Sequence, residues 1–336
     1  MTVNSMIPRP EHLQAADNDL VEGVLARRPR ALAKAITLIE STRRDHQARA
    51  EQVLAALLPH TGKAIRVGIS GAPGAGKSTF IEALGLHLIE RGHRVAVLAV
   101  DPSSTLSGGS ILGDKTRMEK LAAQPNAFIR PSPSGGSLGG VAERTREAML
   151  VCEAAGFDVV LVETVGVGQS EVSVAGMVDV FALLQMPNAG DDLQAMKKGI
   201  VELADVIAIN KADIDPRAAE TAKRQLEVAL ALLRGAPGER QVRVLALSAH
   251  TGKGIAGFWG EVERLAAAAA RSGELEARRR RQALDWMWAL IEGELRRRFR
   301  HHPSVSKALE PVCREVAAGR ITPAAAANRL LAYLNG

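Results

Sequence analysis

The sequence predicts an α/β fold in which helices flank a mostly parallel central sheet, with further helical segments at both ends of the chain. Between residues 64 and 247, short segments rich in Val, Ile and Leu alternate with helical stretches. Many of these apolar segments are continuous, which is typical of strands buried on both faces. The expected strands are 64–70, 94–100, 126–130, 157–162, 179–186, 204–210 and 242–247.

The two ends of the chain have helical patterns. Before residue 60, apolar residues recur at helical spacing in two runs that Pro29 separates, and the pattern returns after about Gly254. Pro303 and Pro311 are expected to break the C-terminal helices. We therefore expect an N-terminal helical extension (1–60), an α/β domain (61–260) and a C-terminal helical arm (261–336).

The last predicted helix, 322–334, starts with Thr322 as a cap and Pro323 at its first position. The apolar stripe on the arm either pairs with a second copy of the chain or packs back on the sheet.

Composition describes a soluble globular protein: 46% of the 336 residues are hydrophobic and 24% are charged. Of the net charge of +6, five units lie after residue 273, where 12 Lys and Arg face 7 Asp and Glu. The arginine clusters there fit a solvated face or a contact with a protein partner. Nucleic acid is the other reading, which we do not favour because only 3% of residues are aromatic.

The two cysteines, Cys152 and Cys313, lie far apart without C-x-x-C spacing, so neither a disulfide framework nor a zinc site is expected. The N-terminal residues lack a secretory pattern, and no apolar run reaches the roughly 18 residues that span a membrane. A cytoplasmic protein without membrane contact is the expectation.

A phosphate-binding loop follows the first predicted strand and opens a helix. It reads Gly71-Ala72-Pro73-Gly74-Ala75-Gly76-Lys77-Ser78-Thr79 and matches G-x-x-x-x-G-K-[ST]. Its glycines allow the backbone N–H groups to surround phosphates at the positive end of the helix. Lys77 supplies a cation for the β- and γ-phosphates and the Ser78 hydroxyl a ligand for Mg²⁺. The motif predicts binding of a nucleoside triphosphate.

A second motif selects the base. The strand 204–210 ends in Asn210-Lys211-Ala212-Asp213, and the next strand ends in Ser248-Ala249. Asp213 can accept hydrogen bonds from N1 and N2 of guanine, which adenine cannot offer, while Lys211 lies along the base plane and the Ala249 N–H meets O6. A site built for such bonds discriminates by about 10⁴–10⁵. We expect GTP and GDP as the bound nucleotides.

Candidates for the Mg²⁺ shell and the γ-phosphate come from two further segments. Glu163 ends the strand 157–162, with Gly166 three residues later as a sensor of the γ-phosphate. The segment after strand 94–100 carries Asp101, Asp114 and Arg117, which are suited to closing over the phosphates, although an ordinary long loop is the alternative.

The expected Mg²⁺ shell is thus Ser78, Asp101, Asp114 and Glu163, and the expected catalytic set is Lys77, Asp101, Asp114, Arg117 and Glu163. Glu163 replaces the aspartate of most GTPases. Val167 stands where many small GTPases have a water-orienting glutamine, and Gln169 is out of register. Slow intrinsic hydrolysis is therefore expected.

Taken together, these motifs resemble the MeaB/ArgK family, to which the methylmalonic aciduria type A protein belongs. The most specific marks are Asp101 to Ser104, Gly109 to Arg117, Glu163 to Glu171 and Gly190 to Gly199. The resemblance runs from the phosphate loop through Ser248-Ala249, with helical extensions at both ends as in the family. It implies a P-loop GTPase that is usually homodimeric through its C-terminal helices.

The resemblance also implies a function. Such proteins guard and load an adenosylcobalamin-dependent acyl-CoA mutase, gating cofactor transfer from a cobalamin adenosyltransferase. By position, Asp191, Gln194 and Lys197 would form a switch that responds to the partner. Alternatives are a kinase or ATPase of amino-acid transport, which the guanine motif disfavours, and a metallochaperone GTPase, which the scattered histidines disfavour.

Overall fold

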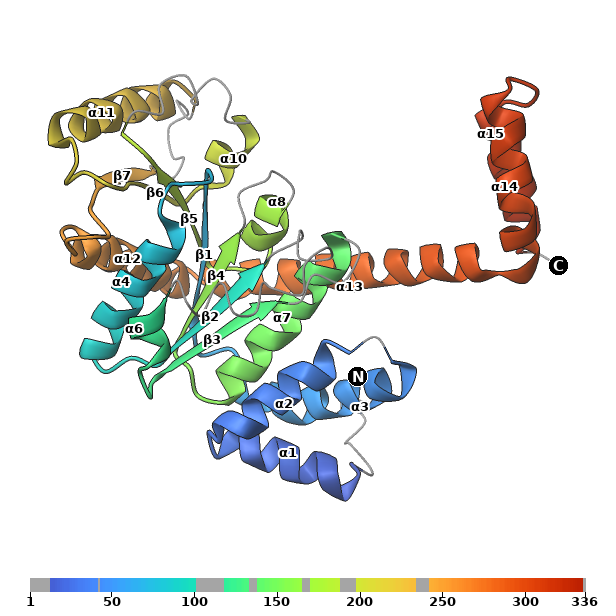
Figure 1. Ribbon diagram of the computed structural model, residues 1–336, viewed down its shortest axis with the longest axis horizontal. Coiled ribbons are helices and arrows are strands. Elements are labelled where there is room, and N and C mark those ends of the chain that lie inside the picture. The colour runs from blue at the N-terminus through green and yellow to red at the C-terminus, as the bar shows by residue number, and fades with distance from the viewer. Residues whose placement is uncertain are drawn as a thin grey trace. The chain divides into compact units, whose positions relative to one another are not determined.

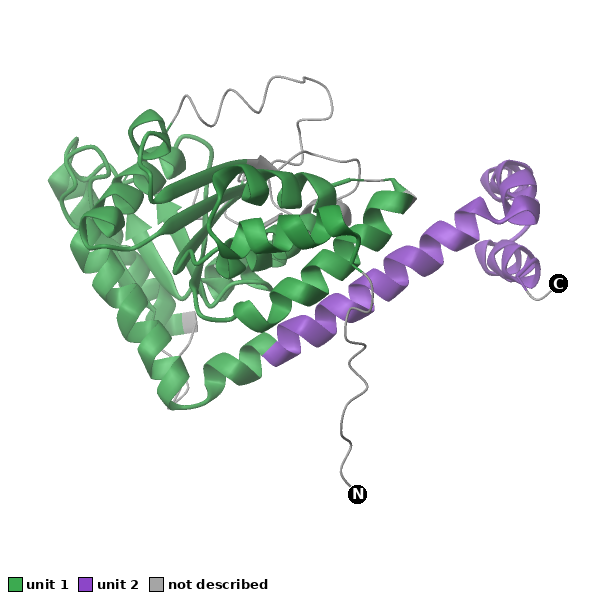
Figure 2. Ribbon diagram, turned by 90° about the horizontal axis from the view of Figure 1, so that it is seen from below, with its two compact units in different colours: residues 1–279 green, residues 280–336 purple. Residues whose placement is uncertain are grey.

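The structure is a computed structural model that describes residues 13–41, 43–100, 118–132, 138–164, 170–187, 198–233 and 242–334. The chain divides into two compact units, residues 1–279 and 280–336 (Figure 2). The first unit contains the sheet. The domain limits expected at residues 60 and 260 stay predictions.

The sheet has seven strands in the order β3-β2-β4-β1-β5-β6-β7, and every neighbouring pair is parallel (Figure 1). The strands are β1 Ile65–Gly71, β2 Val95–Val100, β3 Ala127–Ser132, β4 Val159–Thr164, β5 Val180–Gln185, β6 Val206–Ile209 and β7 Arg243–Ala246. All the predicted strands are confirmed, each within two residues at both ends. β2, β4, β5 and β6 are buried at every position, which explains why their sequences do not alternate.

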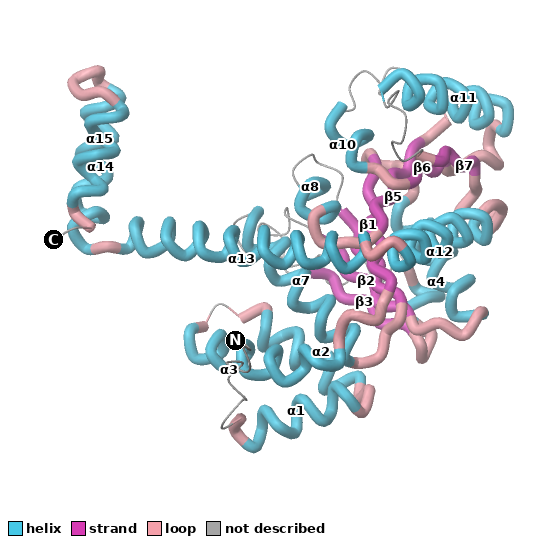
Figure 3. Tube along the Cα trace, turned by 180° about the vertical axis from the view of Figure 1, so that it is seen from behind, coloured by secondary structure: helices cyan, strands magenta, loops and turns pink. Residues whose placement is uncertain are grey.

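Helices cover both faces of the sheet, because successive strand residues point to opposite sides. On one face, α4 (Lys77–Glu90), α6 (Glu119–Ala122) and α12 (Ile255–Arg271) share a core with Val67, Ile69 and Leu161. On the other face, α7 (Leu138–Ala154) and α8 (Ser170–Ala175) pack on the strands (Figure 3). The helices α10 (Lys198–Leu203) and α11 (Pro216–Leu233) cover the sheet near β6 and β7.

The N-terminal helices are α1 (Ala15–Leu25), α2 (Pro29–Ile39) and α3 (Arg44–Leu57), followed by the short 3₁₀ helix η1 (Leu58–His60). Two helical runs were expected here and the structure forms three helices. They extend the core over α7 rather than forming a separate body, since Val24, Ile36 and Val53 are fully buried in the same cluster as the strand residue Val160.

The last helices are α13 (Glu274–His301), α14 (Pro303–Ala317) and α15 (Pro323–Ala332). The expected cap of α15 is confirmed, because the Thr322 hydroxyl accepts a bond from the Ala325 N–H at 3.2 Å. The break expected at Pro311 is wrong: Pro303 begins α14, but Pro311 lies inside it. Burial of Val312 in the core shared with α15 offsets the hydrogen bond that the proline removes.

No helix among the described residues is long and apolar enough to cross a membrane.

Candidate nucleotide site

The carboxyl ends of the parallel strands gather most of the predicted site residues at one edge of the sheet. β1 ends at Gly71, and α4 begins at Lys77 after the phosphate-binding loop. Gly76 caps α4 with φ +84°, where a Cβ would lie 2.7 Å from Nδ2 of Asn210. Gly71 passes so close to β5 that a Cβ would lie 2.3 Å from the carbonyl oxygen of Leu184. Both glycines are therefore required by the backbone, as the motif predicts.

Lys77 is the charged side chain of this loop, and it is only 9% exposed. Its ammonium donates hydrogen bonds to the carbonyl oxygens of Gly71 at 2.8 Å and Ala72 at 3.2 Å. Burial lowers the pKa of Lys77, while the charges of Glu163 and Glu171 oppose that shift. Within the described residues, the ammonium thus hydrogen-bonds to neutral carbonyl groups, which it can exchange for phosphate oxygens.

Ser78 and Glu163 meet as the metal prediction requires. The register of β1 against β4 pairs Ile69 with Glu163, so the end of β4 lies beside the start of α4. The Ser78 hydroxyl donates to Oε1 of Glu163 at 3.0 Å, and Glu163 is 8% exposed. A hydroxyl and a carboxylate are the oxygen ligands that Mg²⁺ takes alongside phosphates and waters. The pair fits Mg²⁺, although the described residues contain no cluster of three His, Cys, Asp or Glu side chains.

Asn210 joins the phosphate loop to the base-reading loop. Its Nδ2 donates to the carbonyl oxygen of Ala75 at 2.8 Å, and its Oδ1 accepts from the Ala249 N–H at 2.9 Å. Asn210 is 1% exposed, so both bonds are shielded from water. The amide acts as a bridge between the two loops, which sequence reasoning assigned only to base recognition.

Asp213 and Lys211 flank this bridge. The Ser248 hydroxyl hydrogen-bonds Asp213 and holds the pKa of this exposed carboxyl below its usual value. Lys211 has a left-handed backbone, with φ +61°, and its Nζ lies 3.9 Å from the sulfur of Met186. Thr79, the last residue of the motif, is exposed on the first turn of α4.

Several predicted residues lie outside the described part of the chain, and their roles stay predictions. They are Asp101, Asp114, Arg117, Gly166, Asp191, Gln194 and Lys197.

Sequence reasoning assigned no role to two features of this edge. Thr164 donates through its hydroxyl to the Ser70 hydroxyl at 2.9 Å, which ties β4 to β1 just below the loop. Glu171, on α8, is 2% exposed, and its charge acts to raise the pKa of Lys77 against the effect of burial. Both residues lie in the segment Glu163 to Glu171 that marks the family resemblance, but the contacts depend on which elements become neighbours.

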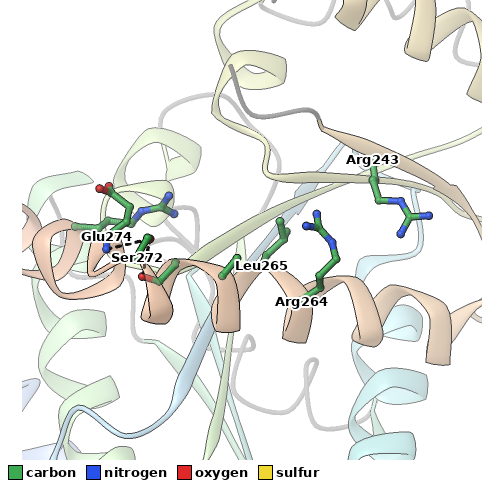
Figure 4. A pocket seen from close by; sticks show the side chains of 8 residues that line it. Arg243, Arg264, Leu265, Ser272 and Glu274 are labelled. Atoms are coloured by element: carbon green, nitrogen blue, oxygen red, sulfur yellow. Dashed lines mark hydrogen bonds between the residues drawn. The ribbon is translucent and has the colours of Figure 1, made fainter. Parts of the chain in front are cut away.

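A pocket of about 700 Å³ lies away from this edge, where β7 begins and α12 ends (Figure 4). Arg243 and Arg264 line it, and both bind the buried carboxylate of Glu261. Burial raises the pKa of Glu261, but the two guanidinium groups outweigh it and hold the pKa below the usual value. These arginines neutralise a buried acid, and the pocket is distinct from the nucleotide site.

The fold and the loop geometry define the class of the protein, a P-loop nucleotide-binding protein. The family model described as methylmalonyl-CoA mutase-associated GTPase MeaB matches residues 32–304, so the chain belongs to this family of GTPases. The expected resemblance is thereby confirmed.

Two relatives and one solved structure are similar to this protein over most of its length. A probable GTPase of Mycobacterium tuberculosis is 54% identical over 95% of this chain and 96% of its own. The methylmalonic aciduria type A homolog of Mus musculus is 45% identical over 93% of this chain and 78% of its own. The crystal structure of a LAO/AO transport system kinase is 37% identical, has a TM-score of 0.77, and covers 97% of this chain and 100% of its own.

Proposed function

We propose that the protein is a GTPase chaperone that gates cobalamin loading of an adenosylcobalamin-dependent acyl-CoA mutase and protects or reactivates that mutase. The observation that carries the proposal is the match of the mutase-associated GTPase family over residues 32–304. The relative in Mus musculus, named for methylmalonic aciduria type A, supports it. The mutase would be methylmalonyl-CoA mutase or a close relative, and a cobalamin adenosyltransferase would supply the cofactor.

In this proposal the chain's own residues bind and orient GTP. Lys77 neutralises charge on the β- and γ-phosphates, and Ser78 with Glu163 holds Mg²⁺, which supplies further charge neutralisation when bound. Asp101 and Asp114 would complete the metal shell, and Arg117 would assist at the phosphates. Asp213 reads guanine.

Slow hydrolysis follows from the absence of a glutamine at position 167, where the chain has Val167. A partner would complete the arrangement that orients water, with Asp191, Gln194 and Lys197 as the responsive segment. Lys197→Ala is expected to keep basal turnover and to lose stimulation by the mutase. A Lys197→Ala protein that responds fully to the mutase would remove the switch from the proposal.

The assay for the whole proposal is phosphate release from GTP and from ATP, with and without purified cobalamin-dependent mutases. Stimulation of GTP turnover by one mutase is expected and would identify the client. GTP turnover that ignores every mutase would contradict the chaperone role, and a preference for ATP would instead favour a transport-associated kinase.

We further propose a homodimer formed through the C-terminal helices. In residues 280–336, large apolar side chains spaced three or four apart on α13 are exposed by 38–60%. They are Leu284, Met287, Trp288, Ile291 and Leu295. Such a stripe is typical of a helix that pairs with another helix.

Light scattering tests the dimer. Ile291→Glu is expected to convert a dimer to monomers, whereas the control Val228→Glu, at a position 62% exposed on α11, should leave the mass unchanged. A monomeric parent protein would overturn the proposal.

A further inference from the structure

Two arginines meet at the edge of the sheet where the strands begin, away from the nucleotide site. They are Arg27, which follows α1, and Arg94, which precedes β2, and both belong to the first unit. We propose that their guanidinium groups form a binding site for a phosphate group, either free phosphate or a small phosphate monoester. The inference rests neither on GTP hydrolysis nor on the mutase.

The two side chains meet at Gly156, directly after α7. A Cβ on Gly156 would lie 3.0 Å from Nε and 3.2 Å from Nη2 of Arg27, and 3.2 Å from Nη1 of Arg94. The missing side chain therefore leaves room for both guanidinium groups at one place. The fold brings them there because α1 and α2 pack on α7, while β4, the next strand after Gly156, is the neighbour of β2 (Figure 1).

Arg94 is held with its guanidinium group beside this glycine. Its Nη1 donates to the carbonyl oxygens of Ala155 at 2.8 Å and Gly156 at 3.2 Å, and its Cζ lies 4.6 Å from the centroid of the Phe157 ring. Both hydrogen bonds use the same nitrogen, so Nε and Nη2 keep their capacity to donate to a ligand.

Asp158 is the carboxylate whose charge acts on Arg94, but its oxygens are engaged elsewhere. Its Oδ1 accepts from the backbone N–H of Arg94 at 2.7 Å, and its Oδ2 lies 2.9 Å from Nδ1 of His93. Burial and the charge of Arg27 lower the pKa of Arg94, whereas Asp158 acts to raise it. The two guanidinium groups thus lie together without an ion pair to any described carboxylate, an arrangement that a bound oxyanion would stabilise.

The backbone of Arg27 is strained. Arg27 has φ +61°, and among the described non-glycine residues only Lys211, of the base-reading motif, also has a positive φ. α1 ends with the Arg27 N–H bonded to the carbonyl oxygen of Val24 at 2.8 Å. α7 ends in the same way, with the Gly156 N–H bonded to the carbonyl oxygen of Glu153 at 2.8 Å, and there the position has the glycine that this motif favours. An arginine in its place points to a role for the side chain.

A phosphate group fits the pair better than a carboxylate does. A phosphate monoester carries a charge of about −1.5 to −2 at pH 7 and three acceptor oxygens, so it can accept from both guanidinium groups at once. The planar fork of each guanidinium matches two phosphate oxygens. A single carboxylate would leave one of the two positive charges uncompensated.

Inorganic phosphate is the first probe, added to the full chain saturated with GDP so that the nucleotide site is occupied. Calorimetric titration gives the Kd, and phosphate at about ten times that concentration should raise Tm by about 2 °C over NaCl of equal ionic strength. No shift, or a shift that NaCl reproduces, would overturn the inference.

Arg27→Gly removes one guanidinium group and introduces the residue that a left-handed backbone favours. Phosphate binding should weaken by at least about tenfold, because charge-assisted hydrogen bonds are lost. Tm without phosphate should not fall, since the backbone strain is relieved. A phosphate shift that survives the substitution would overturn the inference. So would a lower Tm without phosphate, which marks a packing role for Arg27.

Arg217→Ala is the matched control, because it removes an exposed arginine from α11, which packs on β6 and β7 at the far end of the sheet from β2. Its phosphate response should equal that of the parent protein, and an equal loss there would reduce the effect to general charge and overturn the site. Glycerol phosphate distinguishes the two sources. Tighter binding than that of inorganic phosphate identifies a phosphate monoester as the ligand, and weaker or equal binding identifies free phosphate.

Discussion

The two edges of the sheet use their charged side chains in different ways. At the edge where the strands begin, Arg279 binds Asp179 at 2.8 and 2.6 Å, and Arg66 binds Glu153 at 2.6 and 3.1 Å. At the edge where the strands end, Lys77 bonds to backbone carbonyl groups, and Glu163 accepts from a hydroxyl. In the described part of the chain, the first edge joins these guanidinium groups to carboxylates directly, whereas these bonds of Lys77 and Glu163 at the second edge run to neutral groups, while the charges of Glu163 and Glu171 act on Lys77 through space.

The ion pairs at the first edge belong to a hydrogen-bond network around the start of β1. Arg279 also donates to the carbonyl oxygens of Gly62 and Ala64, and Glu153 accepts from the Gly62 N–H. Asp179 is 5% exposed and also accepts a hydrogen bond from the backbone N–H of Arg66. Each buried carboxylate there has a guanidinium partner, so removing one partner would strand a buried charge.

The hydrogen bonds to neutral groups at the second edge suit ligand exchange. Lys77 can exchange its two carbonyl partners for phosphate oxygens, and Glu163 can exchange a hydroxyl partner for Mg²⁺. The comparison teaches that carboxylates hydrogen-bonded directly to guanidinium groups stabilise the fold, whereas charged groups whose hydrogen bonds run to neutral partners can exchange those partners for a ligand.

The largest effect is expected from Lys77→Ala, which removes the cation of the nucleotide edge. kcat/KM for GTP should fall by roughly 10³-fold, as when an electrostatic stabiliser of a transition state is lost. Stability should hardly change, because the hydrogen bonds that Lys77 makes with the described residues go to two loop carbonyls. Phosphate release measures kcat/KM, and thermal unfolding measures stability. A large drop in Tm would contradict the difference between the edges.

Arg279→Ala is the counterpart at the other edge. It leaves Asp179 buried and unpaired, and the free energy of unfolding should fall by about 3 kcal/mol. The remaining folded protein should bind GDP with unchanged Kd. Urea unfolding and nucleotide titration test this prediction. The control Arg279→Lys keeps the charge and should lose less stability. Weaker GDP binding with unchanged stability would instead place Arg279 in nucleotide binding.

Asp213→Asn probes base selection. The amide offers a donor where guanine also has donors, so affinity for GTP should fall by about 10²-fold or more while xanthosine triphosphate gains affinity. Fluorescent-nucleotide competition gives both constants. Equal loss for both nucleotides would show that Asp213 supports the loop and does not read the base.

The smallest effect is expected from Glu261→Gln, away from the nucleotide. The folded-state pKa of Glu261 is held below its usual value, so its charge contributes stability above the unfolded pKa of about 4.3, and that contribution is lost as pH falls. The variant should be about 1 kcal/mol less stable at pH 7, with the gap closing below about pH 4. If the difference in stability between Glu261→Gln and the parent protein stays constant down to pH 3, the charge of Glu261 does not account for the stabilisation.

Much of the fold could be predicted from the chain alone, because the strands are short, continuous and apolar. The phosphate loop and the Asn210–Asp213 motif were located by spacing, and both lie at strand ends as expected. The break at Pro311 was predicted wrongly, since local propensity carries no information on the core that holds α14 together.

The sequence by itself determined the sheet, the nucleotide class and the family, because the glycine-rich loop and the base-reading motif need particular residues at fixed spacing. Only the tertiary structure decided that Asn210 bridges Ala75 and Ala249, and that Ser78 meets Glu163. It also set how close α8 lies on β1, because Val174 packs against Gly68, where a Cβ would lie 2.8 Å from its Cγ1. These contacts join residues far apart in the chain, and strand order and packing, which no local pattern encodes, bring them together.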